Sequence, residues 1–241
     1  MIFKFLMGNS LIISRFNENL NWLENFSQFN ILIYNKGKKL PNNSFRNIIN
    51  INNVGRESQT WLYHIFNNYE NLDETNIFLQ GRIDDLGCMA FQDPSLYLKE
   101  IDKYGFVASR YGILGPLHWD KNVGVEKDKR YKKDWDSGKI SKSKLGFRKF
   151  AKTFFPDIPI FVTTSYGGCF AVKKELIQIY KKDFYAELLE ILSRHKNPIE
   201  GHYLERLWCY MFTKNIYFTK SIKDVIKTKI ERNKFSLFNF N

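Results

Sequence analysis

Two adjacent carboxylates, Asp84 and Asp85, follow an apolar run that ends in Gln80 and Gly81. Carboxylates at the end of a strand can bind a divalent cation that in turn holds a diphosphate, because Mg²⁺ and Mn²⁺ prefer oxygen ligands. A surface turn leading into Gly87 is the simpler alternative. We expect a metal at Asp85, and we take both aspartates as candidate catalytic residues.

A second group of residues is typical of a phosphate-binding turn. Val54, Gly55, Arg56 and Glu57 directly precede an amphipathic helix expected over residues 58–68. The glycine permits close backbone approach, and the helix start offers free N–H groups and a positive dipole end. Arg56 can pair with a phosphate or with Glu57, and the sequence leaves both open.

Polar residues also follow the first two expected strands, residues 11–14 and 30–34. In open α/β sheets ligands bind at such strand ends, although each segment is a plain turn by default. The residues expected to bind a nucleotide are Arg15, Asn17, Glu18, Asn35, Lys36, Gly37, Val54, Gly55, Arg56, Gln80 and Gly81.

The helix expected over residues 201–212 carries a third set of chemical groups. His202, Glu205 and Arg206 lie at positions i, i+3 and i+4, so they share one helical face. Such a face can supply a general base and a cation for phosphate, with a solvated ion pair as the alternative. We expect Glu205 to be the base, with Asp84 or Glu200 as substitutes. The acceptor side is expected to comprise Tyr166, Gly167, Gly168, His202, Arg206 and Trp208.

Strands that alternate with helices predict an α/β fold with a mostly parallel central sheet flanked by helices. The remaining segments follow the same pattern. Further strands are expected at residues 47–51, 76–80 and 158–162, and further helices at 20–26, 174–180 and 185–194.

We expect a single domain over residues 1–241. Residues 1–117 form its nucleotide-sugar-binding half, and residues 156–241 form its acceptor-side half and helical tail. Between them, residues 118–155 are rich in Lys and Arg and weakly periodic. This segment is interpreted as a basic insertion or mobile loop, either a solvated charged face or a flap that closes over phosphates.

The amino-acid composition limits the classes of protein to which the chain can belong. The chain of 241 residues is 44% hydrophobic and 17% aromatic, which excludes disorder. Its net charge of +12 indicates an anionic partner, including peripheral contact with an anionic membrane surface. The three cysteines have no metal-ligand spacing and are expected to be inert thiols. Without a signal peptide or a membrane-length apolar run, a cytoplasmic location is expected.

Five blocks in a fixed order together resemble the DUF3431 family of glycosyltransferase-like proteins, and also small viral glycosyltransferases of GT-A type. The blocks are residues 14–23, 33–37, 53–57 with 63–65, 78–81 and 205–208. They span roughly residues 11–212, and their order is far more specific than any single block.

The resemblance implies a GT-A-like, Rossmann-like fold, a nucleotide-sugar donor and a divalent cation, Mn²⁺ or Mg²⁺. Residues 82–85 fill the place of the family's aspartate-containing patch, with the cleanest match at Asp85. The implied activity is transfer of a sugar to a glycan, lipid-linked or other hydroxyl acceptor, in surface polysaccharide or glycan synthesis.

Two other classes of function remain open at this point. One is a basic module that binds nucleic acid or an acidic polymer, and the other is a metal-dependent phosphoryl-transfer or hydrolytic enzyme. The aromatic residues lie mostly in apolar periodic runs, which favours a core over a stacking platform. No nucleic-acid partner is therefore expected.

Overall fold

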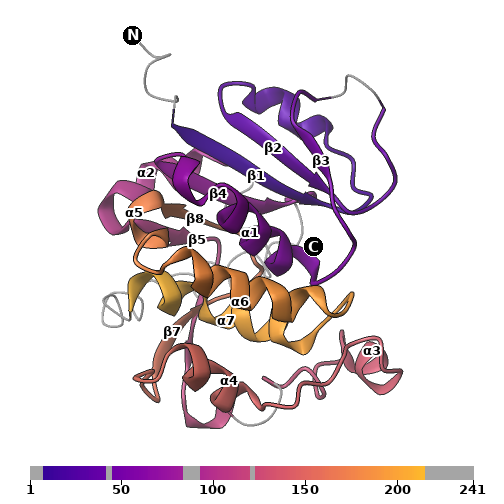
Figure 1. Ribbon diagram of the computed structural model, residues 1–241, viewed down its shortest axis with the longest axis vertical. Coiled ribbons are helices and arrows are strands. Elements are labelled where there is room, and N and C mark those ends of the chain that lie inside the picture. The colour runs from indigo at the N-terminus through magenta and orange to yellow at the C-terminus, as the bar shows by residue number, and fades with distance from the viewer. Residues whose placement is uncertain (1–7, 42–44, 84–92, 120–122, 215–241) are drawn as a thin grey trace, which may run out of the picture.

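The computed structural model describes residues 8–41, 45–83, 93–119 and 123–214. Its centre is a six-stranded sheet in the order β3-β2-β1-β4-β8-β5 (Figure 1). The first four strands of the chain pair in parallel, whereas β8 is antiparallel to both β4 and β5. The strands are β1 (Asn9–Arg15), β2 (Asn30–Asn35), β3 (Ile48–Asn50), β4 (Thr75–Gln80), β5 (Phe106–Ala108) and β8 (Phe170–Lys173). The expectation of a mostly parallel sheet flanked by helices is confirmed.

A two-stranded antiparallel sheet, β6 (Tyr111–Leu114) with β7 (Val162–Ser165), lies beside the main one. The α-helices are α1 (Arg56–Asn67), α2 (Ser95–Tyr104), α3 (Lys132–Asp136), α4 (Phe147–Phe154), α5 (Lys174–Ile177), α6 (Lys182–Ser193) and α7 (Ile199–Thr213). Short 3-10 helices are η2 (Asn21–Phe26), η3 (Tyr69–Asn71) and η4 (Pro116–His118). Figure 1 shows α1, α6 and α7 packed together along one side of the main sheet.

Alternation along the strands divides the core between the two faces of the sheet. Ile12 and Phe78 belong to the cluster that includes α1, α6 and α7. Ile13 and Leu79, one residue further along each strand, belong to the cluster that includes α2 and η2. All four side chains are fully buried, which explains why these strands are continuous apolar runs in the sequence.

The apolar side chains of the basic segment 118–155 pack into the molecule over its described part, while many of its lysines and arginines are exposed. Trp119 and Ile140 are buried, and α4 inserts Phe147 and Phe150 into the core. The Trp119 ring stacks on Phe147 at a centroid distance of 4.9 Å. In the sequence, the frequent lysines and arginines of this segment obscure the spacing of its apolar residues.

Two expectations need correction. The late strand expected at residues 158–162 begins only at Val162, while Phe161 is 49% exposed. Cys209 is a buried free thiol, but Cys169 is disulfide-bonded, so the expectation of inert thiols throughout is wrong. Among the described helices, none has the length and apolar character needed to cross a bilayer.

Candidate functional site

The site lies where the order of the parallel strands reverses. From β1 the chain passes to β2 on one side, and β4 then pairs with β1 on the other side. The connections therefore diverge between β1 and β4, which opens a crevice at the carboxyl ends of these strands. β1 ends at Arg15 and β4 ends at Gln80, so both side chains border that crevice.

Two adjoining cavities occupy this edge of the sheet. The smaller, which we call the strand-end cavity, has a volume of about 260 Å³ and is lined by Ser14, Arg15, Phe16, Glu18, Lys36, Asn53, Arg56, Glu57 and Gln80. The larger, the arginine cavity, has a volume of about 510 Å³ and is lined by Arg56, Glu57, Gln80, Arg110, Leu114, His118, Val123, Arg130, Tyr131, Tyr166, Gly167, Glu205 and Arg206. Arg56, Glu57 and Gln80 belong to both, so the two cavities meet at these three residues.

Arg15 holds together the loops that form the strand-end cavity. Its Nη1 donates to Asn35 Oδ1 at 2.6 Å and to the carbonyl of Lys38 at 2.9 Å, and its Nε donates to the carbonyl of Glu18 at 3.0 Å. The side chain is only 7% exposed. Arg15 therefore fixes the ends of β1 and β2 relative to each other, as well as lining the cavity.

Lys36 braces the turn before α1. Its ammonium group donates to the carbonyls of Val54, at 2.6 Å, and Arg56. Burial lowers the pKa of Lys36 to about 7, against the opposing attraction of Glu57. The ammonium group therefore binds the backbone carbonyls on either side of Gly55, and Lys36 stabilises the turn that carries Arg56.

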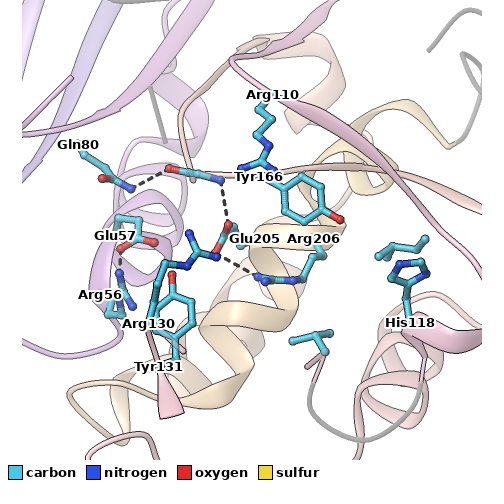
Figure 2. Close-up of a pocket in the computed structure, with 13 residues that line it drawn as sticks. Arg56, Glu57, Gln80, Arg110, His118, Arg130, Tyr131, Tyr166, Glu205 and Arg206 are labelled. Carbon is cyan, nitrogen blue, oxygen red and sulfur yellow. Dashed lines mark hydrogen bonds and ion pairs between the residues drawn. The ribbon is translucent and has the colours of Figure 1, made fainter. Parts of the chain in front are cut away.

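A chain of polar contacts crosses the arginine cavity (Figure 2). Gln80 Nε2 donates to the carbonyl of Gly167 at 2.7 Å, and the N–H of Gly167 donates to Glu205 Oε1 at 2.8 Å. Glu205 Oε2 lies 3.2 Å from Arg206 Nη1. The sheet end, the turn before β8 and α7 are therefore connected through the backbone of one residue, Gly167.

Glu205 is an ionised anchor in this chain. Burial alone raises its pKa, but Arg206, His202 and the N–H of Gly167 outweigh burial, and the pKa lies below the ordinary value. Both carboxylate oxygens already have partners. A carboxylate with a lowered pKa and engaged oxygens is a weak proton acceptor, which argues against the expected role of Glu205 as general base.

Tyr166 lies between two guanidinium groups. The centre of its ring is 5.1 Å from Arg110 Cζ and 5.6 Å from Arg206 Cζ. Gly112 makes room for the ring, because a Cβ there would lie 2.4 Å from Tyr166 Cε2. Cation–π attraction therefore draws both arginines towards the Tyr166 ring.

The basic segment contributes a further arginine. Arg130 lines the cavity and forms a forked pair with Asp128, with Nη2 at 2.6 Å from Oδ2. Hydrogen bonds from Arg130 lower the pKa of Asp128 to about 2. Next to it, Tyr131 packs edge-on against the buried ring of His202, with ring centres 5.1 Å apart. His202 thus lies behind the wall of the cavity.

The described residues do not by themselves form a metal site. Asp84 and Asp85, expected as the metal-binding and catalytic pair, lie outside the described residues. Within the described ranges no group of three or more His, Cys, Asp or Glu side chains could hold a metal ion. The two carboxylates among the described residues that line the arginine cavity, Glu57 and Glu205, each lie within ion-pair distance of an arginine.

The structure brings many of the expected site residues together. Arg15, Glu18, Lys36, Arg56 and Gln80 line the strand-end cavity, and Tyr166, Gly167, Glu205 and Arg206 line the arginine cavity.

Other expected residues do not line either cavity. Asn17, Asn35, Gly37, Val54, Gly55 and Gly81 form the supporting turns, and Gly168 accepts a hydrogen bond from Trp61. Trp208 is fully buried and packs on Phe170, so its expected place on the acceptor side is wrong. Glu200, the substitute base, lines a different cavity.

Sequence reasoning left Glu57 out of the expected site, and it also missed four polar residues that line the arginine cavity: Arg110, His118, Arg130 and Tyr131. All four come from the part of the chain that carried no strand or helix expectation before residue 158. The only available signal was the basic composition of residues 118–155, which does not say which arginine faces a cavity.

The fold and the site define an α/β protein with an arginine-lined cleft at the carboxyl edge of its sheet. A family model described as "Protein of unknown function (DUF3431)" matches residues 11–227, and the chain belongs to this family. No curated protein and no solved structure matches the chain.

Proposed function

We propose that this protein is a glycosyltransferase of GT-A type that uses a nucleoside-diphosphate sugar as donor. The observation that supports this most strongly is the pair of cavities that meet at Arg56, Glu57 and Gln80, at the reversal point of the strand order. A nucleoside-diphosphate sugar has its charged diphosphate between the nucleoside and the sugar. This arrangement matches two cavities that meet at Arg56.

In this proposal the nucleoside occupies the strand-end cavity. Phe16 lines that cavity and is 49% exposed, an unusual setting for a phenyl ring that a stacked base would cover. Glu18 lies on the same wall, where a carboxylate can accept hydrogen bonds from ribose hydroxyls.

The diphosphate lies at the junction between the cavities. Arg56 is 38% exposed there and stands at the start of α1, whose N–H groups and dipole favour an anion. Arg130 lines the larger cavity nearby, as Figure 2 shows. Both guanidinium groups can stabilise the charge that develops on the leaving diphosphate. A cation at Asp85 would add to this charge stabilisation.

The sugar and the acceptor share the arginine cavity, and Glu57 is our candidate for the base that activates the acceptor hydroxyl. Glu57 lies where the two cavities meet, with a side chain 14% exposed and Oε2 3.4 Å from Arg56 Nε. Glu205 serves in this scheme as a positioning residue that holds Gly167 and Arg206.

Thermal-shift measurements with UDP, GDP, CDP and ADP, each with and without Mn²⁺, test the donor assignment. A nucleotide that binds only the folded state raises the melting temperature by mass action. Arg56→Gln should weaken its binding by about tenfold or more, because a charge-assisted contact is lost. Arg46→Gln, at an exposed arginine in the loop before β3, is the matched control.

Absence of any nucleotide shift, or equal affinity in Arg56→Gln, would refute the donor site. A metal-dependent phosphoryl-transfer or hydrolytic enzyme remains the competing function, and product analysis separates the two. Transfer leaves the sugar on an acceptor hydroxyl together with a nucleoside diphosphate. Cleavage at phosphorus instead releases a nucleoside monophosphate and a sugar phosphate.

A further inference from the structure

Exposed apolar side chains gather where η4 meets the segment before β7. Leu117 in η4 is 87% exposed, and Ile160 and Phe161 are 48% and 49% exposed. Trp119 Nε1 donates to the carbonyl of Ile160 at 2.6 Å, and a Cβ on Gly115 would lie 3.0 Å from the Phe161 ring. These contacts bring the two segments together, so the three exposed side chains form one surface, which we call the apolar patch.

The backbone beneath the apolar patch is held in place by α4. The buried ring of Trp119 stacks on Phe147, and Arg148 Cζ lies 4.5 Å from the centre of the Trp119 ring. Arg148 also donates to the carbonyls of Ile158, at 3.3 Å, and Pro159, at 3.0 Å. The patch is therefore a supported surface that faces solvent, and contiguous apolar surfaces of this kind mark interaction sites.

Basic side chains border the apolar patch on the α4 side. Arg148 contacts the segment that carries the patch, and Lys152 lies one turn further along the same face of α4. Lys149 and Lys152 are exposed, and neither forms an ion pair with any residue that the structure describes. Residues 137–161 contain six lysines and arginines but one acidic residue, Asp157. An apolar surface with a basic border complements a partner that is anionic outside and apolar within.

The charge argues against the two occupants that the chain itself could supply. A second copy would present the same basic border and a net charge of +12, which opposes close approach. The C-terminal residues 215–241 contain six lysines and arginines and two acidic residues, so their net charge has the same sign as the border. Nucleic acid matches the charge but has no apolar interior for Leu117. An anionic lipid bilayer matches both features.

We propose that this protein docks onto an anionic lipid bilayer through the apolar patch. The three apolar side chains enter the boundary between headgroups and acyl chains, and the lysines of α4 lie against anionic headgroups. The proposal does not depend on the proposed function, because no residue of the patch lines either cavity.

Docking in this way also orients the arginine cavity. His118 follows Leu117 in η4 and lines the cavity. Figure 2 shows His118 at the end away from Gln80 and Glu57. The bound protein therefore has that end of the cavity close to the membrane surface.

Sedimentation of the full chain with lipid vesicles tests the proposal. Vesicles of phosphatidylcholine with phosphatidylglycerol should bind the protein about tenfold or more tightly than vesicles of phosphatidylcholine alone. The double variant Leu117→Asn/Ile160→Asn should weaken binding to the anionic vesicles by about tenfold or more, because its polar side chains do not enter the bilayer. Ile49→Asn is the matched control, since Ile49 is 37% exposed in β3, at the far edge of the main sheet from α4 (Figure 1).

A second pair of variants tests the basic border. Lys149→Gln/Lys152→Gln should weaken binding to the anionic vesicles by about tenfold or more, because each lysine near an anionic surface strengthens binding about fivefold. Lys99→Gln/Lys103→Gln, at exposed positions of α2, removes the same charge elsewhere and should have a smaller effect. This comparison separates the border of the patch from the general attraction of a basic protein.

Several results would overturn the proposal. They are absence of binding to the anionic vesicles, equal binding to both kinds of vesicle, and equal losses in a patch variant and its control. Full binding by Leu117→Asn/Ile160→Asn would show adsorption by net charge alone and would overturn it too. Sedimentation velocity without lipid tests the second copy, and self-association that this double variant abolishes would assign the patch to a dimer instead. Circular dichroism checks folding, and nucleotide thermal shifts without vesicles should stay unchanged in the patch variants, so the donor site and the docking surface fail separately.

Discussion

The two carboxylates of the arginine cavity differ in how their oxygens are engaged. Both oxygens of Glu205 have partners, the Gly167 N–H and Arg206, whereas Glu57 pairs with Arg56 through Oε2 at the junction. The general base must be the carboxylate that has an oxygen able to receive a proton. We therefore expect Glu57→Gln to lower kcat by about 10²-fold or more and to remove the acid limb of the pH–rate profile.

Glu205→Gln is the matched comparison. An amide at this position keeps an oxygen for the Gly167 N–H but loses the charge opposite Arg206, so kcat should fall by only about tenfold. The acid limb should remain, because the base is still present. Initial rates of sugar transfer between pH 4 and 9 measure both variants. If the limb vanishes in Glu205→Gln and persists in Glu57→Gln, the two roles are reversed.

At the scale of elements, the start of α1 depends on Gly55. This residue has a φ of +62°, and a Cβ on it would lie 2.3 Å from Gln59 Cβ and 2.6 Å from the Leu192 carbonyl. Gly55→Ala should lower the free energy of unfolding by about 3 kcal/mol or more, through backbone strain and overpacking against α6. Gly138→Ala is the control, since Gly138 has a φ of +72° in open space, and it should cost only about 1 kcal/mol. Urea unfolding measures both, and equal losses would contradict the steric explanation.

The sequence predicted the elements whose signals are local. The first four strands are apolar runs bounded by polar turns, and each is found within two residues of its expected limits. β5 and β6 escaped prediction because their partners, β8 and β7, lie about fifty or more residues further along the chain. For the same reason Arg110, which directly precedes β6, gave no sign that it would meet Tyr166 in a cavity.

At the scale of the whole molecule, buried histidines link stability to pH. Burial lowers the pKa of His64 to about 4 and that of His202 to about 3, below the ordinary value of 6.5. The folded state therefore binds fewer protons than the unfolded chain once the pH falls below 6.5. This stability is complete above pH 6.5 and is lost progressively as the pH falls towards 4 and 3, by about 2 kcal/mol for each histidine at pH 5.

Urea unfolding at pH 7, 6 and 5 tests this linkage. His64→Gln, which removes one of the two buried imidazoles, should reduce the loss between pH 7 and 5 by about 2 kcal/mol. His195→Gln is the control, since His195 is partly exposed. The same slope in His64→Gln and in the wild type would contradict the assignment.

The position of β8 has a consequence for the order in which the molecule is assembled on the ribosome. Residues 9–80 supply four parallel strands early, but the outer edge of β4 from Thr75 to Phe78 stays open until residues 170–173 emerge and pair with it. Nascent chains that stall before residue 170 expose the unpaired N–H and C=O groups of this edge, which can pair with another chain. The same late segment brings the Gly167 carbonyl to Gln80 and the Gly168 carbonyl to Trp61. Completion of the sheet by β8 thus also brings Gly167 to the cleft, before α7 supplies Glu205 and Arg206.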